Sequence, residues 1–228
     1  MGEQGVTLRK MTKEEAAMAV SWAADEGWNP GLADLECFWP VDPEGFCCAE
    51  LDGKIVGTAA VVNYDDRFSF GGFYIVDPAH RAGGIGTQLA RYAMSHAGSR
   101  ILGVDGVVAM VPKYEASGLL FLHYNNARYE GMGGGAMPEG LTPIKDVDFA
   151  RLLAFDTAHF PVQRERFLRC WIAQEGHSGL ARVGSDGVIL GFGVRRTCHT
   201  GYKIGPLFAR DRATAELLLD GLIADIPG

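Results

Sequence analysis

The sequence predicts an α/β fold: a mixed, mostly antiparallel sheet flanked by helices, followed by a second and partial copy of the same arrangement. Strand-like and helix-like segments alternate along the 228 residues, which is typical of packed layers of sheet and helix. The peptide at 52–57 (DGKIVG) returns at 186–191 as DGVILG, each time within a hairpin pattern. A repeat of this kind indicates a second unit built on the same plan.

The first helix begins at a capping box. Thr12 followed by Glu15 matches the S/T-x-x-E pattern, so we expect a helix from there to Gly27, where glycine ends it. The loop EGWNPG at 26–31 follows, and a short helix is expected over 32–38.

Three antiparallel strands come next. An Asp-Gly turn at 52–53, between apolar runs at 46–51 and 54–62, is a strong hairpin signal. A turn at 65–67 then leads to an aromatic and β-branched run at 68–76, which predicts a third strand.

A helix is expected from Ile85 to the stop at Gly98, because apolar residues recur there at spacings of three and four. The later elements of the first half are a strand, a helical piece and a pair of strands, expected at 101–110, 113–117, 119–124 and 127–131.

The second half starts after a glycine-rich and proline-rich stretch, which is typical of a linker. We divide the chain into a first domain at 1–133, a linker at 134–146 and a truncated second domain at 147–228.

The second domain repeats the strand and the helix of the first at 202–208 and 214–223. The connection between them at 209–212 (ARDR) has no glycine, so no phosphate cradle is expected there.

The composition limits the partners. Lys and Arg number 21 against 28 acids, a net charge of −7, which disfavours non-specific binding to nucleic acid or to an anionic membrane. No run reaches the roughly 18 apolar residues of a membrane span, and the N-terminal stretch has no signal core. The five cysteines and six histidines show no metal-ligand spacing. We therefore expect a cytoplasmic protein with reduced thiols and no metal; the oligomeric state stays open.

The most informative stretch is the turn R-A-G-G-I-G-T between a strand and a helix. Gly83, Gly84 and Gly86 bare their backbone N–H groups where a helix start already offers unpaired donors and a partial positive charge. Such a place attracts a phosphate, and Arg81 and Thr87 add a charge and a hydroxyl. A connection that needs glycine only for its dihedral angles would look the same.

Two familiar phosphate loops do not fit this turn. A Rossmann fingerprint needs a third glycine where the chain has Leu89, and a P-loop needs Gly-Lys-Ser/Thr, which does not occur. The pattern R-x-x-G-x-G after a strand instead resembles the acyl-CoA pyrophosphate loop of the GNAT acyltransferases.

The resemblance extends over most of the chain. EGWNPG, VDG at 104–106, YEASG at 114–118 and NNARYEG at 125–131 resemble a bacterial-type GNAT subgroup with tandem domains. HFPVQRERFLRCW and GYKIGPLFARD resemble its degenerate C-terminal domain. The resemblance implies acetyl-CoA or a related acyl-CoA as donor, and a small-molecule or peptide amine as acceptor.

The same resemblance assigns residues to the donor. The end of the third strand is where the family's backbone pairs with the pantetheine arm, and the turn is where it holds the pyrophosphate. The residues that match these positions are Ile75, Val76, Arg81, Ala82, Gly83, Gly84, Gly86 and Thr87.

The catalytic assignments also come from the resemblance. Tyr114 matches a tyrosine that hydrogen-bonds the sulfur and protonates the leaving thiolate, a role that a nearby phenol can serve; a core tyrosine would look the same. The chain departs from the family at Lys113, where Asn is common, and at Leu119, where Phe is common.

For the base that deprotonates the amine, Asp105 is one candidate, though a turn-capping Asp is the simpler interpretation of this residue. A chain of water molecules is another candidate base.

The acceptor side is less determined. Glu26 could line the acceptor pocket, with Trp28 and Asn29 as further contacts; a packed structural loop is the alternative. We therefore expect direct acyl transfer to an amine in a ternary complex. The alternatives are a non-catalytic acyl-CoA sensor and a partner-binding protein with a vestigial loop.

Overall fold

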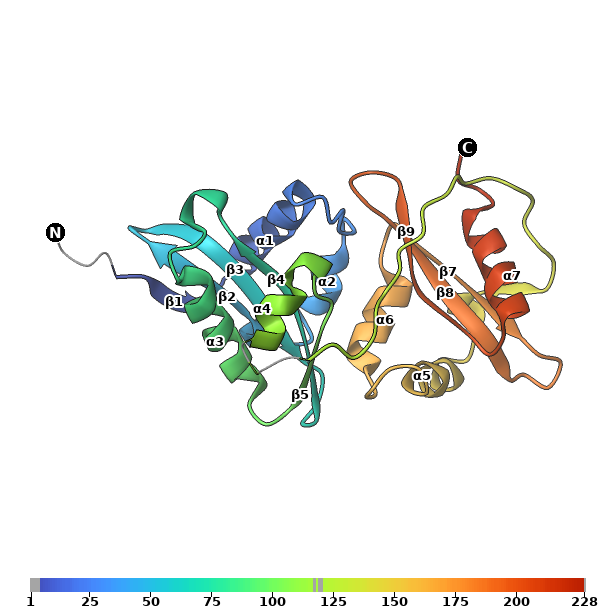
Figure 1. The fold of residues 1–228 in the computed structure, drawn as a ribbon. Coiled ribbons are helices and arrows are strands. Elements are labelled where there is room, and N and C mark those ends of the chain that lie inside the picture. The colour runs from blue at the N-terminus through green and yellow to red at the C-terminus, as the bar shows by residue number, and fades with distance from the viewer. Residues whose placement is uncertain (1–4, 117, 119–120, 228) are drawn as a thin grey trace.

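The computed structural model describes residues 5–116, 118 and 121–227, and these form two α/β halves that lie side by side (Figure 1). The first half holds a five-stranded sheet in the order β1-β2-β3-β4-β5, and the second a four-stranded sheet in the order β6-β7-β8-β9. Among the described strands, β4 and β5 pair in parallel, and the other neighbouring strands are antiparallel. The predicted mixed, mostly antiparallel fold is confirmed.

The first half contains the strands β1 (Thr7–Lys10), β2 (Phe46–Leu51), β3 (Lys54–Asn63), β4 (Phe68–Val76) and β5 (Ile101–Val104). Its helices are α1 (Lys13–Asp25), α2 (Asp34–Phe38), α3 (Ile85–Ala97) and α4 (Val111–Ala116). The predicted capping box is present, because Thr12 and Glu15 bond each other's backbone N–H groups. The strand β1 was not predicted.

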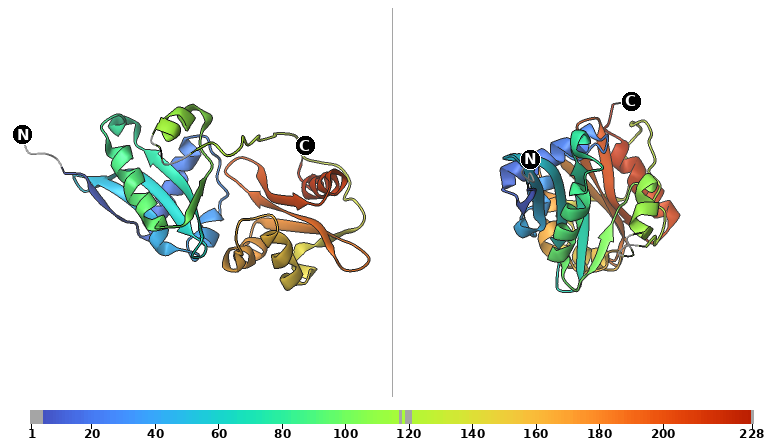
Figure 2. Two further views of the ribbon diagram at one scale, coloured as in Figure 1. Left: turned by 60° about the horizontal axis from the view of Figure 1, so that its bottom comes forward. Right: turned by 60° about the vertical axis from the view of Figure 1, so that its left-hand side comes forward.

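Helices cover both faces of the first sheet (Figure 2). On one face Leu89 and Ala93 of α3 pack with Val56 of β3. On the other, Ala16 and Ala19 of α1 pack in a cluster that includes residues of β2 and β3. The two layers fix the end of β4 between α1 and α3, where the glycine-rich turn begins.

The second half contains β6 (Leu141–Pro143), β7 (His177–Val183), β8 (Ile189–Thr197) and β9 (Tyr202–Ala209). Its helices are α5 (Phe149–Thr157), α6 (Glu165–Ala173) and α7 (Arg212–Ile223). The strand and helix expected at 202–208 and 214–223 are therefore present as β9 and α7. The strand β6 lies within the stretch that was predicted as linker.

The two halves share a packed interface. Phe38 of α2 lies against Phe167 and Trp171 of α6, with ring centroids 5.0 and 5.9 Å apart. An ion pair joins Asp34 Oδ1 to Arg196 Nε at 2.9 Å, and both side chains are largely buried.

A disulfide crosses the same interface. Cys37 on α2 is bonded to Cys170 on α6, across a sequence separation of 133 residues. The prediction that all five cysteines are thiols is therefore wrong for this pair, because the fold brings two distant cysteines together. Cys47, Cys48 and Cys198 are free and buried.

Two other predictions fail between the halves. The strand expected at 101–110 ends at Val104. Of the strands predicted at 119–124 and 127–131, the described residues 121–124 and 127–131 form none, and residues 117, 119 and 120 lie outside the described part. Apolar residues there stay exposed, Phe121 by 85% and Tyr129 by 94%. A strand-like composition forms a strand only against a partner, and here the chain runs as an irregular connection (Figure 1). No helix within the described ranges is long and apolar enough to cross a bilayer.

Candidate active site

The end of β4 and the start of α3 form one continuous turn. After Val76, the Asp77 side chain accepts a hydrogen bond from the Ala79 N–H at 2.9 Å, which begins a single helical turn over Pro78–His80. The chain then passes through Arg81 into α3. The residues that the sequence assigned to the acyl donor therefore lie on the end of β4, in this turn, or, for Gly86 and Thr87, in the first turn of α3.

Each glycine of the turn has its own structural reason. Gly84 has a φ of +83°, a left-handed conformation that side chains rarely adopt. A Cβ on Gly86 would lie 2.7 Å from the Tyr74 hydroxyl, so a side chain there would crowd the packing of α3 on β4. Gly83 is open, with only one backbone atom near the position of a Cβ. The open position leaves room for a ligand to approach the backbone.

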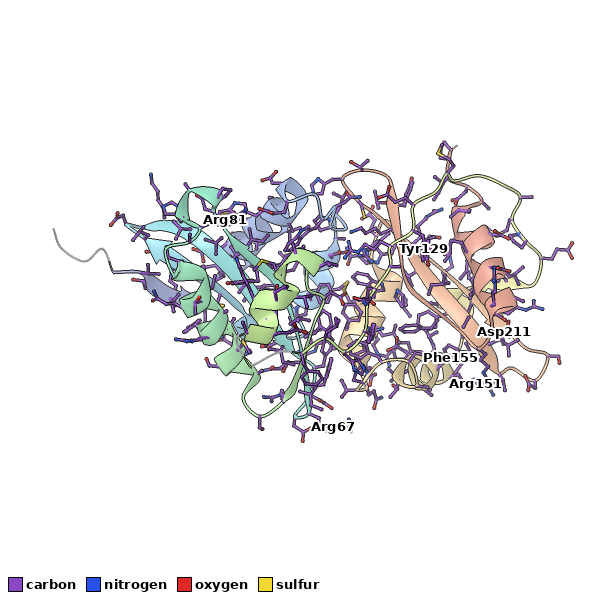
Figure 3. The ribbon with its side chains drawn as sticks, viewed as in Figure 1. Arg67, Arg81, Tyr129, Arg151, Phe155 and Asp211 are labelled. Carbon is purple, nitrogen blue, oxygen red and sulfur yellow. A yellow bond between two sulfur atoms is a disulfide. The ribbon has the colours of Figure 1, made fainter. Side chains whose placement is uncertain are left out.

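The start of α3 has no side-chain cap. Gly84 is its N-cap and has no side chain to accept from the N–H groups of the first turn. By contrast, the start of α7 is capped by Asp211, whose carboxylate accepts from the Thr214 N–H at 2.8 Å. The positive end of α3 is therefore available to an external anion, whereas a carboxylate already occupies that of α7. Figure 3 labels Asp211 in the second half and Arg81 beside the turn in the first.

Arg81 extends from the turn to the end of β4. Its Nε donates to the Val76 carbonyl at 2.8 Å, and its Nη2 pairs with the carboxylate of Glu26 at the end of α1. The side chain is 49% exposed, so the guanidinium is anchored at one side and open to solvent at another.

The last part of β4 extends beyond its neighbour β5. Their parallel register runs from Phe68 opposite Ile101 to Gly71 opposite Val104, where β5 ends. The ladder between β3 and β4 is irregular just beyond this point, between Gly72 and Ile75, and Phe73 in this interval has a φ of +50°. Such bulges re-aim backbone groups and often lie next to active sites. The edge of β4 from residue 72 to 76 therefore opens next to the turn.

Tyr114 lies on α4, and its position connects it to the turn. Its ring packs against Gly106: a Cβ on Gly106 would lie 2.7 Å from a carbon of the Tyr114 ring. The pKa of Tyr74 is raised by burial and, to a smaller extent, by Tyr114, so the two phenols lie close enough to interact electrostatically. Because the Tyr74 hydroxyl also lies beside Gly86, the two tyrosines continue the site from the turn toward α4.

Tyr74 is the site residue that sequence reasoning missed. The signal was its spacing, since alternation along β4 places Tyr74 on the same face as Val76, toward α3. Burial raises the pKa of Tyr114 above its ordinary value, so its phenol is protonated at neutral pH and can donate a proton.

Asp105 follows directly after β5, on the exposed side of the site. Its Oδ1 accepts a hydrogen bond from the Asn126 side chain at 2.8 Å. The carboxylate is thus oriented by the connection between the halves and remains exposed to solvent.

The residues expected at the acceptor pocket lie in a loop that contacts the second half. Asn29 donates to the Thr200 carbonyl at 2.8 Å and accepts from the Thr200 N–H at 3.0 Å. The Trp28 carbonyl accepts from Lys203. These contacts use the Asn29 amide to join the halves, while Glu26 turns toward Arg81 instead.

A cavity of about 330 Å³ lies between the halves beyond this loop. Its walls come from both of them: Leu32, Ala33, Gln174, Glu175, Gly176, His177 and Thr197. None of the residues predicted from the sequence lines it.

The fold and the turn define a class: α/β proteins of the GNAT type, in which a glycine-rich turn joins the end of a strand to the start of a helix. A model described as "Acetyltransferase (GNAT) family" matches residues 11–116, and one described as "Acetyltransferase (GNAT) domain" matches residues 152–228. The holothin acyltransferase of Pseudoalteromonas sp. (strain SANK 73390) is 31% identical over 223 residues, which cover 97% of this chain and 75% of the relative. The chain belongs to the GNAT acetyltransferase family, and it is an acyltransferase.

Solved structures share the two-domain fold. A protein described as an acetyltransferase from Pyrococcus horikoshii superposes with a TM-score of 0.79 at 24% identity, over 98% of this chain and 79% of its own. A GCN5-related N-acetyltransferase from Sphaerobacter thermophilus gives 0.57 at 19% identity, over 98% and 84%. At these identities the likeness supports the fold, and the roles of individual residues stay predictions.

Proposed function

We propose that this acyltransferase moves an acetyl or related acyl group from acyl-CoA to an amine, by direct attack while both substrates are bound. The observation that carries the proposal is the uncapped start of α3 with Arg81 beside it, at the open end of β4. A diphosphate suits this place, because backbone N–H groups, the helix dipole and a guanidinium all favour a negative charge there.

The donor would extend from the turn along the strand. With the diphosphate on the N–H groups of residues 83–87, the pantetheine arm would follow the edge of β4 from Val76 back toward Gly72, where β5 no longer covers it. Backbone groups of an open strand edge can pair with an extended amide chain. The thioester would then lie near the bulge at Phe73 and the tyrosines beyond the turn.

The reaction needs no covalent enzyme intermediate. The neutral amine attacks the thioester carbonyl, a C–N bond forms, the C–S bond breaks, and the nitrogen loses a proton to a base. Backbone N–H groups at the strand end would polarise the carbonyl. Tyr114 would protonate the departing CoA thiolate, since burial keeps its phenol protonated. Asp105 is the candidate base nearest the end of β5, acting directly or through water.

The acceptor is expected to enter between the halves. The loop after α1 contacts both the turn and the second half, so the second half would shape the acceptor pocket. The relative is named for holothin, so holothin is the first acceptor to test, next to a panel of small amines and peptides.

Binding and turnover test the proposal separately. Acetyl-CoA at 100 times its Kd should stabilise the chain by about 2.7 kcal/mol, measured as a thermal shift. Consumption of acetyl-CoA with an amine should then be detected by release of free thiol. Absence of any shift would contradict donor binding, and a shift without turnover of any acceptor would favour the acyl-CoA sensor.

A further inference from the structure

The guanidinium that the proposed function assigns to the diphosphate already has an anionic partner. The Glu26 carboxylate pairs with Nη2 of Arg81, while Nε is held by the Val76 carbonyl. Both side chains are only partly exposed, Arg81 by 49% and Glu26 by 33%. A donor phosphate that approached this guanidinium would therefore meet a carboxylate already paired with it.

The backbone holds Glu26 in this position. It is the C-cap of α1, and Gly27, with a φ of +77°, completes the helix end: the N–H of Gly27 bonds Ala24 and the N–H of Trp28 bonds Ala23. This is the pairing of a Schellman motif, which fixes the last turn of a helix.

The loop beyond Glu26 is anchored as well. Asn29 is bonded to Thr200, and the Leu32 N–H donates to the Thr197 carbonyl at 3.0 Å. The loop is thus fixed at both ends, and the helix end and the anchored loop hold the Glu26 carboxylate next to Arg81. Figure 3 shows Arg81 at the same end of the first half as the end of α1.

We propose that Glu26 is an internal counter-ion of Arg81 that competes with the diphosphate of acyl-CoA and so sets the affinity for the donor. The inference rests on the proposed function. On binding, the diphosphate displaces the Glu26 carboxylate from Nη2, while the bond from Nε to Val76 keeps the guanidinium at the strand end. Glu26 then acts on the donor site through Arg81 as a positioning residue. This role does not require Glu26 to contact the acceptor.

The test compares the Kd for CoA and acetyl-CoA, by isothermal titration calorimetry, between the native chain and Glu26→Gln. Removing the competing charge should lower the Kd about two- to fivefold, as expected for a partly exposed ion pair. The difference should shrink at 0.5 M salt, because screening weakens both interactions. Asp25→Asn is the matched control: it removes the same charge one position earlier, at an exposed site, and should leave the Kd nearly unchanged.

The outcomes separate this inference from the proposed function. If the native chain binds no CoA, both fall. If it binds and Glu26→Gln binds equally or more weakly, or Asp25→Asn gives the same gain, only the competition is wrong. A loss of kcat in Glu26→Gln with an unchanged Kd would instead make Glu26 an acceptor or base residue. Glu26→Asp, which withdraws the carboxylate by one methylene, should also bind more tightly and replaces Glu26→Gln if that variant does not fold.

Discussion

Ala82 is a non-glycine residue of the candidate donor turn, and its backbone is left-handed. Its φ of +68° places the Cβ close to the following carbonyl, at a cost of roughly 1–2 kcal/mol for an ordinary side chain. The turn keeps this conformation because the start of α3 and the end of β4 fix both of its sides. The strain lies in the segment to which a diphosphate is proposed to bind.

Ala82→Gly should therefore stabilise the chain by up to about 1 kcal/mol, the relief of strain being partly offset by the greater freedom of glycine when unfolded. Chemical denaturation measures this. Gly84→Ala, at a φ of +83°, should act in the opposite direction by about 1–2 kcal/mol. An unchanged free energy of unfolding in both variants would show that the turn relaxes freely and stores no strain.

Tyr114→Phe tests the proton donor. The substitution should lower kcat by about 10²–10⁴-fold, the usual contribution of general acid catalysis, with little change in the Kd for acetyl-CoA. Because burial raises the pKa of Tyr114, its phenol stays protonated at neutral pH, and the loss of its donor role should occur at a higher pH than the ordinary pKa of tyrosine would give. A pH–rate profile of the native enzyme checks this, and a full-rate Tyr114→Phe would exclude the role.

At the scale of elements, local signals were sufficient for most of the first half from α1 to α3, although not for β1. The capping box at Thr12, the Asp52-Gly53 hairpin and the stop at Gly98 each involve neighbours in sequence, and each is present in the structure. The candidate donor turn could likewise be located from its own residues. Interactions between residues close in sequence determine these features, so they can be predicted from a single sequence.

Long-range contacts could not be predicted in this way. The pairing of Glu26 with Arg81, the use of Asn29 to join the halves and the Cys37–Cys170 bond all depend on segments far apart in the chain. The strands predicted beyond residue 118 failed for the same reason, since composition shows a capacity for pairing and does not supply a partner.

The packing of α3 on β4 gives a prediction at this scale. Gly86→Ala should destabilise the chain by about 1–2 kcal/mol, because its Cβ would lie 2.7 Å from the Tyr74 hydroxyl. Tyr74→Phe removes that oxygen, so the same glycine substitution should cost less in this background. A double-mutant cycle by denaturation measures the coupling, and strictly additive effects would contradict the contact.

At the scale of the whole molecule, the two halves behave as one packed unit. Rings from α2 and α6 share a core, and the buried pair of Asp34 and Arg196 lies beside it. The second half therefore contributes to the stability of the first, in addition to its proposed place at the acceptor site.

Asp34→Ala should destabilise the chain by about 3–5 kcal/mol, because it leaves the guanidinium of Arg196 buried without its carboxylate. The pair of Lys13 and Glu36 offers a matched control, since both side chains are about half exposed. Glu36→Ala should cost less than about 1 kcal/mol. Thermal unfolding of both variants decides; a small loss for Asp34→Ala would mean that water reaches the interface.

The exposed connection has a further consequence for how the chain comes apart. Arg128 and Tyr129 lie on an irregular segment open to solvent, which is where proteases cut folded proteins first. Brief trypsin treatment should nick the chain after Arg128. The disulfide-bonded Cys37 and Cys170 lie on opposite sides of that nick, so the disulfide would link the two fragments. The two fragments should therefore migrate as one band on a denaturing gel without reductant and as two bands with it. Two bands without reductant would show that the halves are held by packing alone.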